Sequence, residues 1–226
     1  MIHQIPEVLK PEEAAALRRK LLEARWLEGA KTAGVSAAPV KTNRELDRSD
    51  PFFEPAVRQV LDALARSRPF TAKALPLTTS TPYFNRYEKG QSYGLHYDNA
   101  LGPIPGRSGL MRADLSATLF LSDQADYDGG ELSVEDTYGF HQVKLPAGHL
   151  VVYSAGALHE VKPVTRGERV ACFFWIQSLV HDEQERAILA DLDNALALLS
   201  KDHPRHEAVM ALTRGYNHLL RKWSEV

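Results

Sequence analysis

The stretch LSATLFLSDQADYDGGELSVEDTYGFHQVKLPAGHLVVYSAGALHEVKPVTRGERVACFFWIQ, residues 115–177, decides the fold class of this chain. Short runs of alternating apolar and polar residues follow one another, separated by glycine and proline turns. Alternation with a period of two is typical of a strand buried on one face. With the same pattern upstream, from about Thr79, the predicted strands are Thr81–Tyr87, Tyr93–Asp98, Leu115–Leu121, Glu131–Val134, Gln142–Leu145, Leu150–Tyr153, His159–Val164 and Arg169–Gln177. Short strands with tight connections and no long helix between them predict a sandwich or barrel.

Residues 99–113 interrupt this pattern. They contain three glycines and two prolines, too irregular for a strand, and we expect a lid or binding loop. Arg107 and Arg112 belong to this loop. They are either solvated surface charges or groups that attract an anionic substrate.

Helical patterns flank the β region. Ala14, Leu17 and Leu21 form an apolar stripe after Pro11, and a second stripe spans 57–64 and ends near Pro69. Residues 29–50 are predicted to be loop or irregular extended chain. After Asp182, a helix-capping residue, two stripes separated by His203-Pro204 predict a helical hairpin that covers the β domain or joins two subunits. We therefore expect a mainly β protein in three parts: an N-terminal helical and mixed region (1–77), the β core (78–178) and a C-terminal helical extension (179–226).

Composition excludes several classes of protein. The 226 residues carry a net charge of -2, so nothing indicates a nucleic acid or an anionic membrane as partner. A single cysteine, Cys172, excludes an internal disulfide. No signal peptide or membrane span is apparent. We expect a soluble, cytoplasmic protein.

Three residues in the β region could form a metal site. In His96-Tyr97-Asp98, the imidazole and the carboxylate lie at i and i+2, on the same face of a strand. His159, at the start of a later strand, would complete two histidines and one carboxylate. This is the ligand set of non-haem Fe(II) oxygenases, which leaves metal positions open for a co-substrate and O2. The His-x-Asp triplet alone is a weak signal, because such triplets are common by chance.

Arg169 supports the interpretation of these three residues as a functional site. Arg166-Gly167 predicts a hairpin turn, so we expect Arg169 on the strand that pairs with the one carrying His159. By alternation it shares a face with Ala171, Phe173 and Trp175, and a buried charge there requires a partner. The partner is either a structural carboxylate of the protein or the carboxylate of a ligand.

The spacing of these residues resembles that of a known family. His-x-Asp, a distal histidine and a basic residue ten positions later are similar to the Fe(II)/2-oxoglutarate dioxygenases of the prolyl hydroxylase type. Further stretches agree: Asn85-Arg86-Tyr87, Tyr93 to Asp98, Asp114 to Ser122, and Asp128-Gly129-Gly130-Glu131-Leu132. The whole chain, including Trp175-Ile176-Gln177-Ser178 and the tail that ends Arg221-Lys222-Trp223-Ser224-Glu225, resembles the bacterial PKHD-type hydroxylases of the PiuC group.

The resemblance implies a double-stranded β-helix, a jelly-roll variant, with the site inside its open end. It implies that His96, Asp98 and His159 bind Fe(II), that Arg169 binds the distal carboxylate of 2-oxoglutarate and that Tyr87 hydrogen-bonds the same co-substrate. It further implies hydroxylation of an unactivated C–H bond, with conversion of 2-oxoglutarate and O2 to succinate and CO2, ascorbate as reductant, and a link to bacterial iron uptake.

Several questions stay open at this stage. The substrate is a small molecule, such as a siderophore or an amino acid, or a residue in a protein or peptide, as for prolyl and lysyl hydroxylases. A non-catalytic cupin-like metal-binding or sensor module and a zinc hydrolase are the alternative functions. A homodimer through helices 182–226 is a further hypothesis.

Overall fold

A large antiparallel sheet forms the centre of the protein. The computed structural model describes residues 2–32 and 40–226. The strands of this large sheet follow the order β1-β13-β9-β16-β5-β3-β2, and β4 pairs with the C-terminal part of β16. The bounds are β1 (Ile2–Ile5), β2 (Trp26–Glu28), β3 (Arg44–Leu46), β4 (Pro76–Thr79), β5 (Tyr83–Tyr87), β9 (Leu115–Phe120), β13 (Leu150–Ser154) and β16 (Arg169–Ser178).

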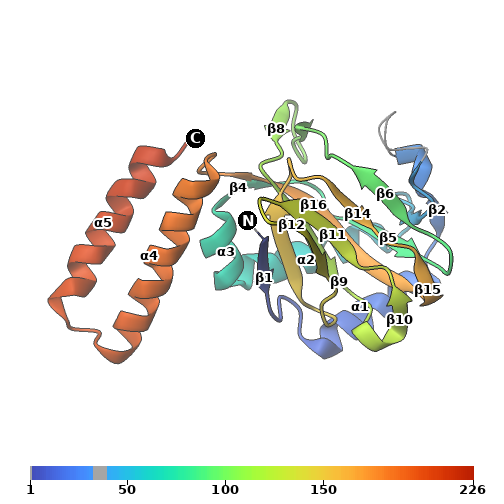
Figure 1. Ribbon diagram of the computed structural model, residues 1–226, viewed down its shortest axis with the longest axis horizontal. Coiled ribbons are helices and arrows are strands. Elements are labelled where there is room, and N and C mark those ends of the chain that lie inside the picture. Colours follow the sequence, from blue (N-terminus) through green and yellow to red (C-terminus); the bar gives the residue numbers. More distant parts are fainter. Residues whose placement is uncertain (1, 33–39) are drawn as a thin grey trace.

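A second, four-stranded sheet packs on the first (Figure 1) and follows the order β12-β11-β14-β6. Apolar residues from both sheets, among them Phe120, Leu132 and Val151, form the core between them. This arrangement confirms the predicted mainly β, jelly-roll fold. The strands are β6 (Tyr93–His96), β11 (Leu132–Asp136), β12 (Gly139–Val143) and β14 (His159–Val161), with two additional pairs, β7 (Leu101–Pro103) with β8 (Leu110–Arg112) and β10 (Tyr127–Gly129) with β15 (Val164–Gly167).

Strand β16 shows why the sequence folds in this way. Val170, Cys172, Phe174 and Ile176 are all completely buried against the helices, and Cys172 is a small core residue. Three residues of the alternate face, Arg169, Phe173 and Trp175, line a cavity between the sheets. The period-two pattern therefore separates a structural face from a functional face on one strand.

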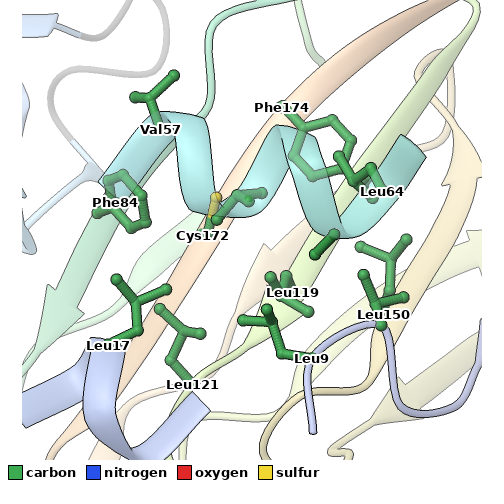
Figure 2. Packing of buried hydrophobic residues seen from close by; sticks show 14 of the residues in the cluster. Leu9, Leu17, Val57, Leu64, Phe84, Leu119, Leu121, Leu150, Cys172 and Phe174 are labelled. Carbon is green, nitrogen blue, oxygen red and sulfur yellow. The ribbon is translucent and has the colours of Figure 1, made fainter. Parts of the chain in front are cut away.

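Helices cover the outer face of the large sheet. The helices before the core are α1 (Pro11–Glu23), α2 (Phe53–Arg66) and α3 (Arg68–Ala74). Figure 2 shows Val57 and Leu64 of α2 above the sheet, close to the side chains of Phe84, Cys172 and Phe174. Burial of such apolar side chains is the main force that holds helices and sheet together.

The C-terminal hairpin comprises α4 (Glu183–Asp202) and α5 (Glu207–Trp223), and it projects from one end of the β core (Figure 1). As expected, Asp182 caps α4 by accepting hydrogen bonds from the backbone of Gln184 and Glu185. The end of the chain returns to the core, where Glu225 pairs with Arg112 at 2.6 Å. Helix α5 packs mainly on α4, its C-terminal turns also contact Leu75 and Val180, and no residue of α5 is buried.

Two segments that were expected to be loops contain strands. Residues 99–113 contain the β7–β8 hairpin, and residues 29–50 contain β3, although both segments were expected to lack strands. Strands of three residues carry too little alternation to be recognised. The predicted boundary between residues 77 and 78 lies within β4, and β1, β2 and β3 belong to the large sheet. None of the helices in the described ranges is long and apolar enough to cross a membrane.

The expected pairing of the strand that carries Arg169 was also wrong. Strand β16 pairs with β4, β5 and β9 of the large sheet, whereas β14, which carries His159, pairs with β6 and β11 of the second sheet. The segment between them forms a separate strand, β15, which pairs with β10. The chain therefore passes from the four-stranded sheet through β15 to the large sheet, and Arg169 and His159 lie on opposite sheets of the jelly roll.

Candidate functional site

The three predicted metal ligands meet at one end of the four-stranded sheet. His96 ends β6, Asp98 follows two residues later, and His159 begins β14 directly opposite His96 in the strand pairing. One potential ligand atom from each residue lies within 4.8 Å of the others. The Nε2 atom of His159 is 3.8 Å from Oδ2 of Asp98. We call these three residues the triad; its donor set, two imidazoles and one carboxylate, fits Fe(II) with open coordination positions.

Hydrogen bonds orient the triad. The Nδ1 atoms of His96 and His159 lie 2.7 Å and 3.0 Å from the carbonyl oxygens of Gly94 and Ala157. Nδ1–H donates to the carbonyl in each case, which leaves Nε2 free to bind a metal. Burial and the neighbouring His159 lower the pKa of His96, so its imidazole is neutral at pH 7, the form that binds metals. The hydroxyl of Ser116 donates to Oδ2 of Asp98 at 2.7 Å and fixes that carboxylate.

A bulge in β6 decides the position of Tyr93. His159 pairs with His96 and Val161 with Tyr93, so three residue steps on β6 oppose two on β14. Tyr93 therefore faces the cavity, although strict alternation would place it on the opposite face. Its ring stacks on that of His96, with centroids 3.6 Å apart.

The triad opens into a cavity of about 530 Å³ between the two sheets. Its lining includes every residue that the sequence analysis singled out as a metal or co-substrate ligand. Tyr87 and Arg169, which are far apart in the chain, meet here because they are partners in the pairing of β5 with β16. The structure thus places all the predicted ligands around one cavity.

Arg169 lies deep in this cavity and has no anionic partner among residues 2–32 and 40–226. Its side chain is 1% exposed, and its Nε and Nη1 atoms are buried with no hydrogen-bond acceptor among the described residues. The guanidinium carbon lies 5.3 Å from the ring centre of Tyr87 and 5.2 Å from that of Phe120. A buried arginine with free donors fits a ligand carboxylate, because an unpaired buried charge is costly.

Tyr87 adds a second buried polar group. Its hydroxyl has no partner among the described residues, and burial raises its pKa to about 12. The phenol therefore stays protonated at neutral pH and can donate a hydrogen bond. Tyr127, also buried next to Arg169, has an unpaired hydroxyl within the described part of the chain, and no feature of the sequence had singled it out.

Gly130 shapes the other side of Arg169. It has a φ of +65°, and a Cβ atom there would lie 3.2 Å from Cδ of Arg169 and 2.9 Å from Val164. The Asp128-Gly129-Gly130 segment therefore leaves room for the arginine.

The rest of the cavity wall contains residues that the sequence analysis did not identify as part of the site. Tyr83, Phe173 and Trp175 form an aromatic wall with ring centroids 5.5–6.0 Å apart. Trp175 is half-buried and lines the cavity, and its indole N–H has no partner among the described residues. From the N-terminal region, Lys41, Asn43, Glu45 and Arg48 also reach the cavity. Nothing in the sequence marks them, because their strand partners are distant in the chain.

The two arginines of the 99–113 segment lie elsewhere. Arg112 is neither a free surface charge nor a cavity residue: it pairs with Asp114 at 3.1 Å and with Glu225 at 2.6 Å. Asp114 in turn accepts a hydrogen bond from the backbone of Ser178 and lies 2.9 Å from Nδ1 of His181. This cluster joins the C-terminal hairpin to the core. Arg107 is exposed.

Comparison with known proteins agrees with this geometry. Residues 82–177 match the 2OG-Fe(II) oxygenase superfamily, and residues 182–225 match the PKHD-type hydroxylase C-terminal domain. The family matches, together with the fold and the site, identify the chain as an Fe(II)- and 2-oxoglutarate-dependent dioxygenase.

Full-length relatives narrow the assignment. The chain is 47% identical over 226 residues to a PKHD-type hydroxylase of Bordetella pertussis, and 48% identical over 226 residues to the PKHD-type hydroxylase YbiX of Escherichia coli. In both comparisons 100% of each chain is covered. The chain belongs to the PKHD-type hydroxylases.

Solved structures show the same fold. A Pseudomonas putida prolyl-4-hydroxylase is 24% identical with a TM-score of 0.51, covering 78% of this chain and 92% of that one. HygX of Streptomyces hygroscopicus, solved with nickel, 2-oxoglutarate and hygromycin B, is 16% identical with a TM-score of 0.55, covering 78% and 82%. At this level of identity the likeness concerns the fold alone.

Proposed function

We propose that His96, Asp98 and His159 hold Fe(II), that Arg169 and Tyr87 bind 2-oxoglutarate, and that the protein hydroxylates an unactivated C–H bond. The observation that carries this proposal is the buried guanidinium of Arg169. Its Nε and Nη1 atoms have no partner among the described residues, and the side chain lines the same cavity as the triad. A structural arginine would have a protein carboxylate beside it. A buried cationic group in the same cavity as a metal-binding triad matches a co-substrate with a carboxylate at each end.

The residues of the chain have separate tasks in this proposal. Arg169 pairs with the distal carboxylate, and the protonated hydroxyl of Tyr87 donates to the same group. Ser116 keeps the Asp98 carboxylate oriented, and the rings of Tyr93 and Tyr153 shield the two histidines from water. When bound, iron with 2-oxoglutarate supplies the activation of O2 for C–H oxidation, with succinate and CO2 as co-products.

The substrate is a wider proposal. The cavity volume suits a small molecule such as a siderophore or amino acid, or a single side chain of a protein or peptide. The family resemblance supports a role linked to iron uptake, with ascorbate as the reductant that restores the iron and the cytoplasm as the place of action.

Anaerobic titration tests the central assignment. Fe(II) and then 2-oxoglutarate are added to the apo-protein while visible absorbance is recorded. We expect a charge-transfer band when 2-oxoglutarate chelates the metal, no band in His159→Ala, and a band that needs far more 2-oxoglutarate in Arg169→Ala. Succinate release then measures turnover. Iron binding without the band would contradict the proposal and favour a metal-binding or sensor module, and turnover with Zn(II) but not Fe(II) would favour a hydrolase.

We also propose that the C-terminal hairpin forms a homodimer interface. Helix α5 has no buried residue, and Ile188, Leu198 and Met210 are exposed on the hairpin. Sedimentation of the full chain tests this: Leu198→Glu combined with Met210→Glu should convert a dimer into a monomer. A wild-type chain that sediments as a monomer at tens of micromolar would refute it.

A further inference from the structure

Arg48 is a charged residue of the cavity wall that the proposed iron and 2-oxoglutarate sites do not use. Its guanidinium carbon lies 4.4 Å from the centre of the Tyr83 ring, a cation–π contact. Within the described ranges it makes no ion pair with any acidic residue, and residues 33–39, AGVSAAP, contain no acidic residue. The neighbouring Asp47 is paired with Arg25 at 2.6 Å.

The other charges of the cavity balance once the co-substrate is bound. Lys41 and Glu45 form a buried ion pair with each other. The distal carboxylate of 2-oxoglutarate would neutralise Arg169, while its other carboxylate and Asp98 would neutralise Fe(II). Arg48 is exposed, and no other charged residue in the described part of the chain lines the cavity, so its charge is left without an anionic partner there.

The aromatic wall connects Arg48 to the triad. Trp175 lies opposite Ser116 in the pairing of β16 with β9, and Ser116 holds Asp98. From Trp175 the wall continues to Tyr83, 6.0 Å away between ring centres, and Arg48 covers the Tyr83 ring. A molecule lying along this wall would therefore have one end near the metal and the other near the guanidinium of Arg48.

We propose that Arg48 is a specificity-determining residue that binds a carboxylate of the substrate, while the flat apolar part of the substrate lies on Tyr83, Phe173 and Trp175. The substrate is then an anionic compound with an aromatic or similarly flat body. A guanidinium held on an aromatic ring presents two parallel donors to a carboxylate and loses little side-chain freedom on binding. This inference rests on the proposed function, because the charge balance assumes iron and 2-oxoglutarate in the cavity.

A matched pair of probes tests the proposal. N-acetyl-L-phenylalanine and its amide differ by one negative charge and have nearly the same shape. Each is titrated calorimetrically, without oxygen, into protein saturated with Fe(II) and 2-oxoglutarate, so that Arg169 is already occupied. We expect the acid to bind about fivefold or more tightly than the amide, within the usual range of a charge-assisted hydrogen bond at a partly solvated site.

Substitutions then assign the preference to one residue. Arg48→Gln should reduce the preference to less than about twofold, Arg48→Lys should keep part of it, and Arg107→Gln, at an exposed arginine outside the cavity lining, should leave it unchanged. Equal binding of acid and amide by the wild type, a preference that survives Arg48→Gln, or no binding of either probe at millimolar concentration each overturns the proposal.

The visible band separates this inference from the proposed function. If the wild type and Arg48→Gln both form the iron–2-oxoglutarate band but the wild type shows no preference for the acid, only the role of Arg48 fails. If the wild type forms no band, the proposed function fails first and the role of Arg48 with it.

Discussion

Replacement of Arg169 by methionine should stabilise the apo-protein and at the same time abolish tight binding of 2-oxoglutarate. The side chain is 1% exposed, and two of its nitrogen atoms are buried without acceptors among the described residues. Each unsatisfied buried donor costs about 1–3 kcal/mol. Methionine has a similar length, no polar hydrogen, and the flexibility to fill the space beside Tyr87 and Phe120.

After allowance for imperfect packing, we expect the free energy of unfolding of the metal-free protein to rise by about 1–3 kcal/mol. For a chain of this size, each kcal/mol corresponds to roughly 2–4 °C in Tm. Loss of a buried bidentate charge pair should weaken 2-oxoglutarate binding by about 2–5 kcal/mol, roughly 30-fold to several thousandfold.

Urea denaturation of the apo-proteins and anaerobic calorimetry with Fe(II) and 2-oxoglutarate measure the two effects. With both ligands present the order of stability should reverse, because binding stabilises only the wild type. Arg166→Met, which removes an exposed arginine paired with Asp128, is the control and should change neither quantity appreciably. A destabilised apo Arg169→Met protein, or one that retains wild-type affinity for 2-oxoglutarate, would refute the argument.

Three further substitutions test other parts of the structure. Ser116→Ala removes the hydrogen bond to Asp98 and should weaken Fe(II) binding about 10- to 100-fold, as measured by anaerobic metal titration; unchanged affinity would show that this hydrogen bond is dispensable. Gly130→Ala forces a Cβ atom against Arg169 at a φ of +65°. Urea denaturation should therefore show that the free energy of unfolding falls by about 1–2 kcal/mol, and calorimetry should show weaker binding of 2-oxoglutarate. A variant with wild-type stability and affinity would contradict the packing described. Burial and the charge of Lys73 lower the pKa of His3 below 6.5 in the folded protein. As the pH drops, the imidazole is therefore protonated at a higher pH in the unfolded chain than in the folded one, and the free energy of unfolding should fall below about pH 6.5. His3→Gln should flatten that acid-side loss in urea denaturation, and an unaltered pH profile would exclude His3 as a cause.

Much of the core could be predicted from the sequence because its strands have one buried face. In β16 the alternation correctly placed Arg169 and Phe173 on one face and Cys172 and Phe174 on the other; the structure shows that the second face meets the helices. The helices with clear apolar stripes, α1, α2, α4 and α5, were also predicted. In β9, Thr118 lines the cavity and Leu119 lies in the helix-covered core, and because both neighbours of Thr118 are apolar, alternation alone does not say which face is inward.

The rest depends on contacts that have no local signal. The inward position of Tyr93 results from a bulge that only the pairing of β6 with β14 reveals. The contribution of Arg48 depends on the N-terminal strand β3, whose pairing with β5 brings that segment to the cavity. Such residues could not be selected from one sequence, because short strands get their positions from tertiary partners rather than from their own residues.

The most direct test of the account is an anaerobic crystal structure of the full chain with Fe(II) and 2-oxoglutarate, in which anomalous scattering locates the iron. We predict iron bound by Nε2 of His96, Nε2 of His159 and a carboxylate oxygen of Asp98, and a 2-oxoglutarate whose distal carboxylate accepts hydrogen bonds from Arg169 and Tyr87. Iron held by other residues, or 2-oxoglutarate bound away from Arg169, would contradict the account.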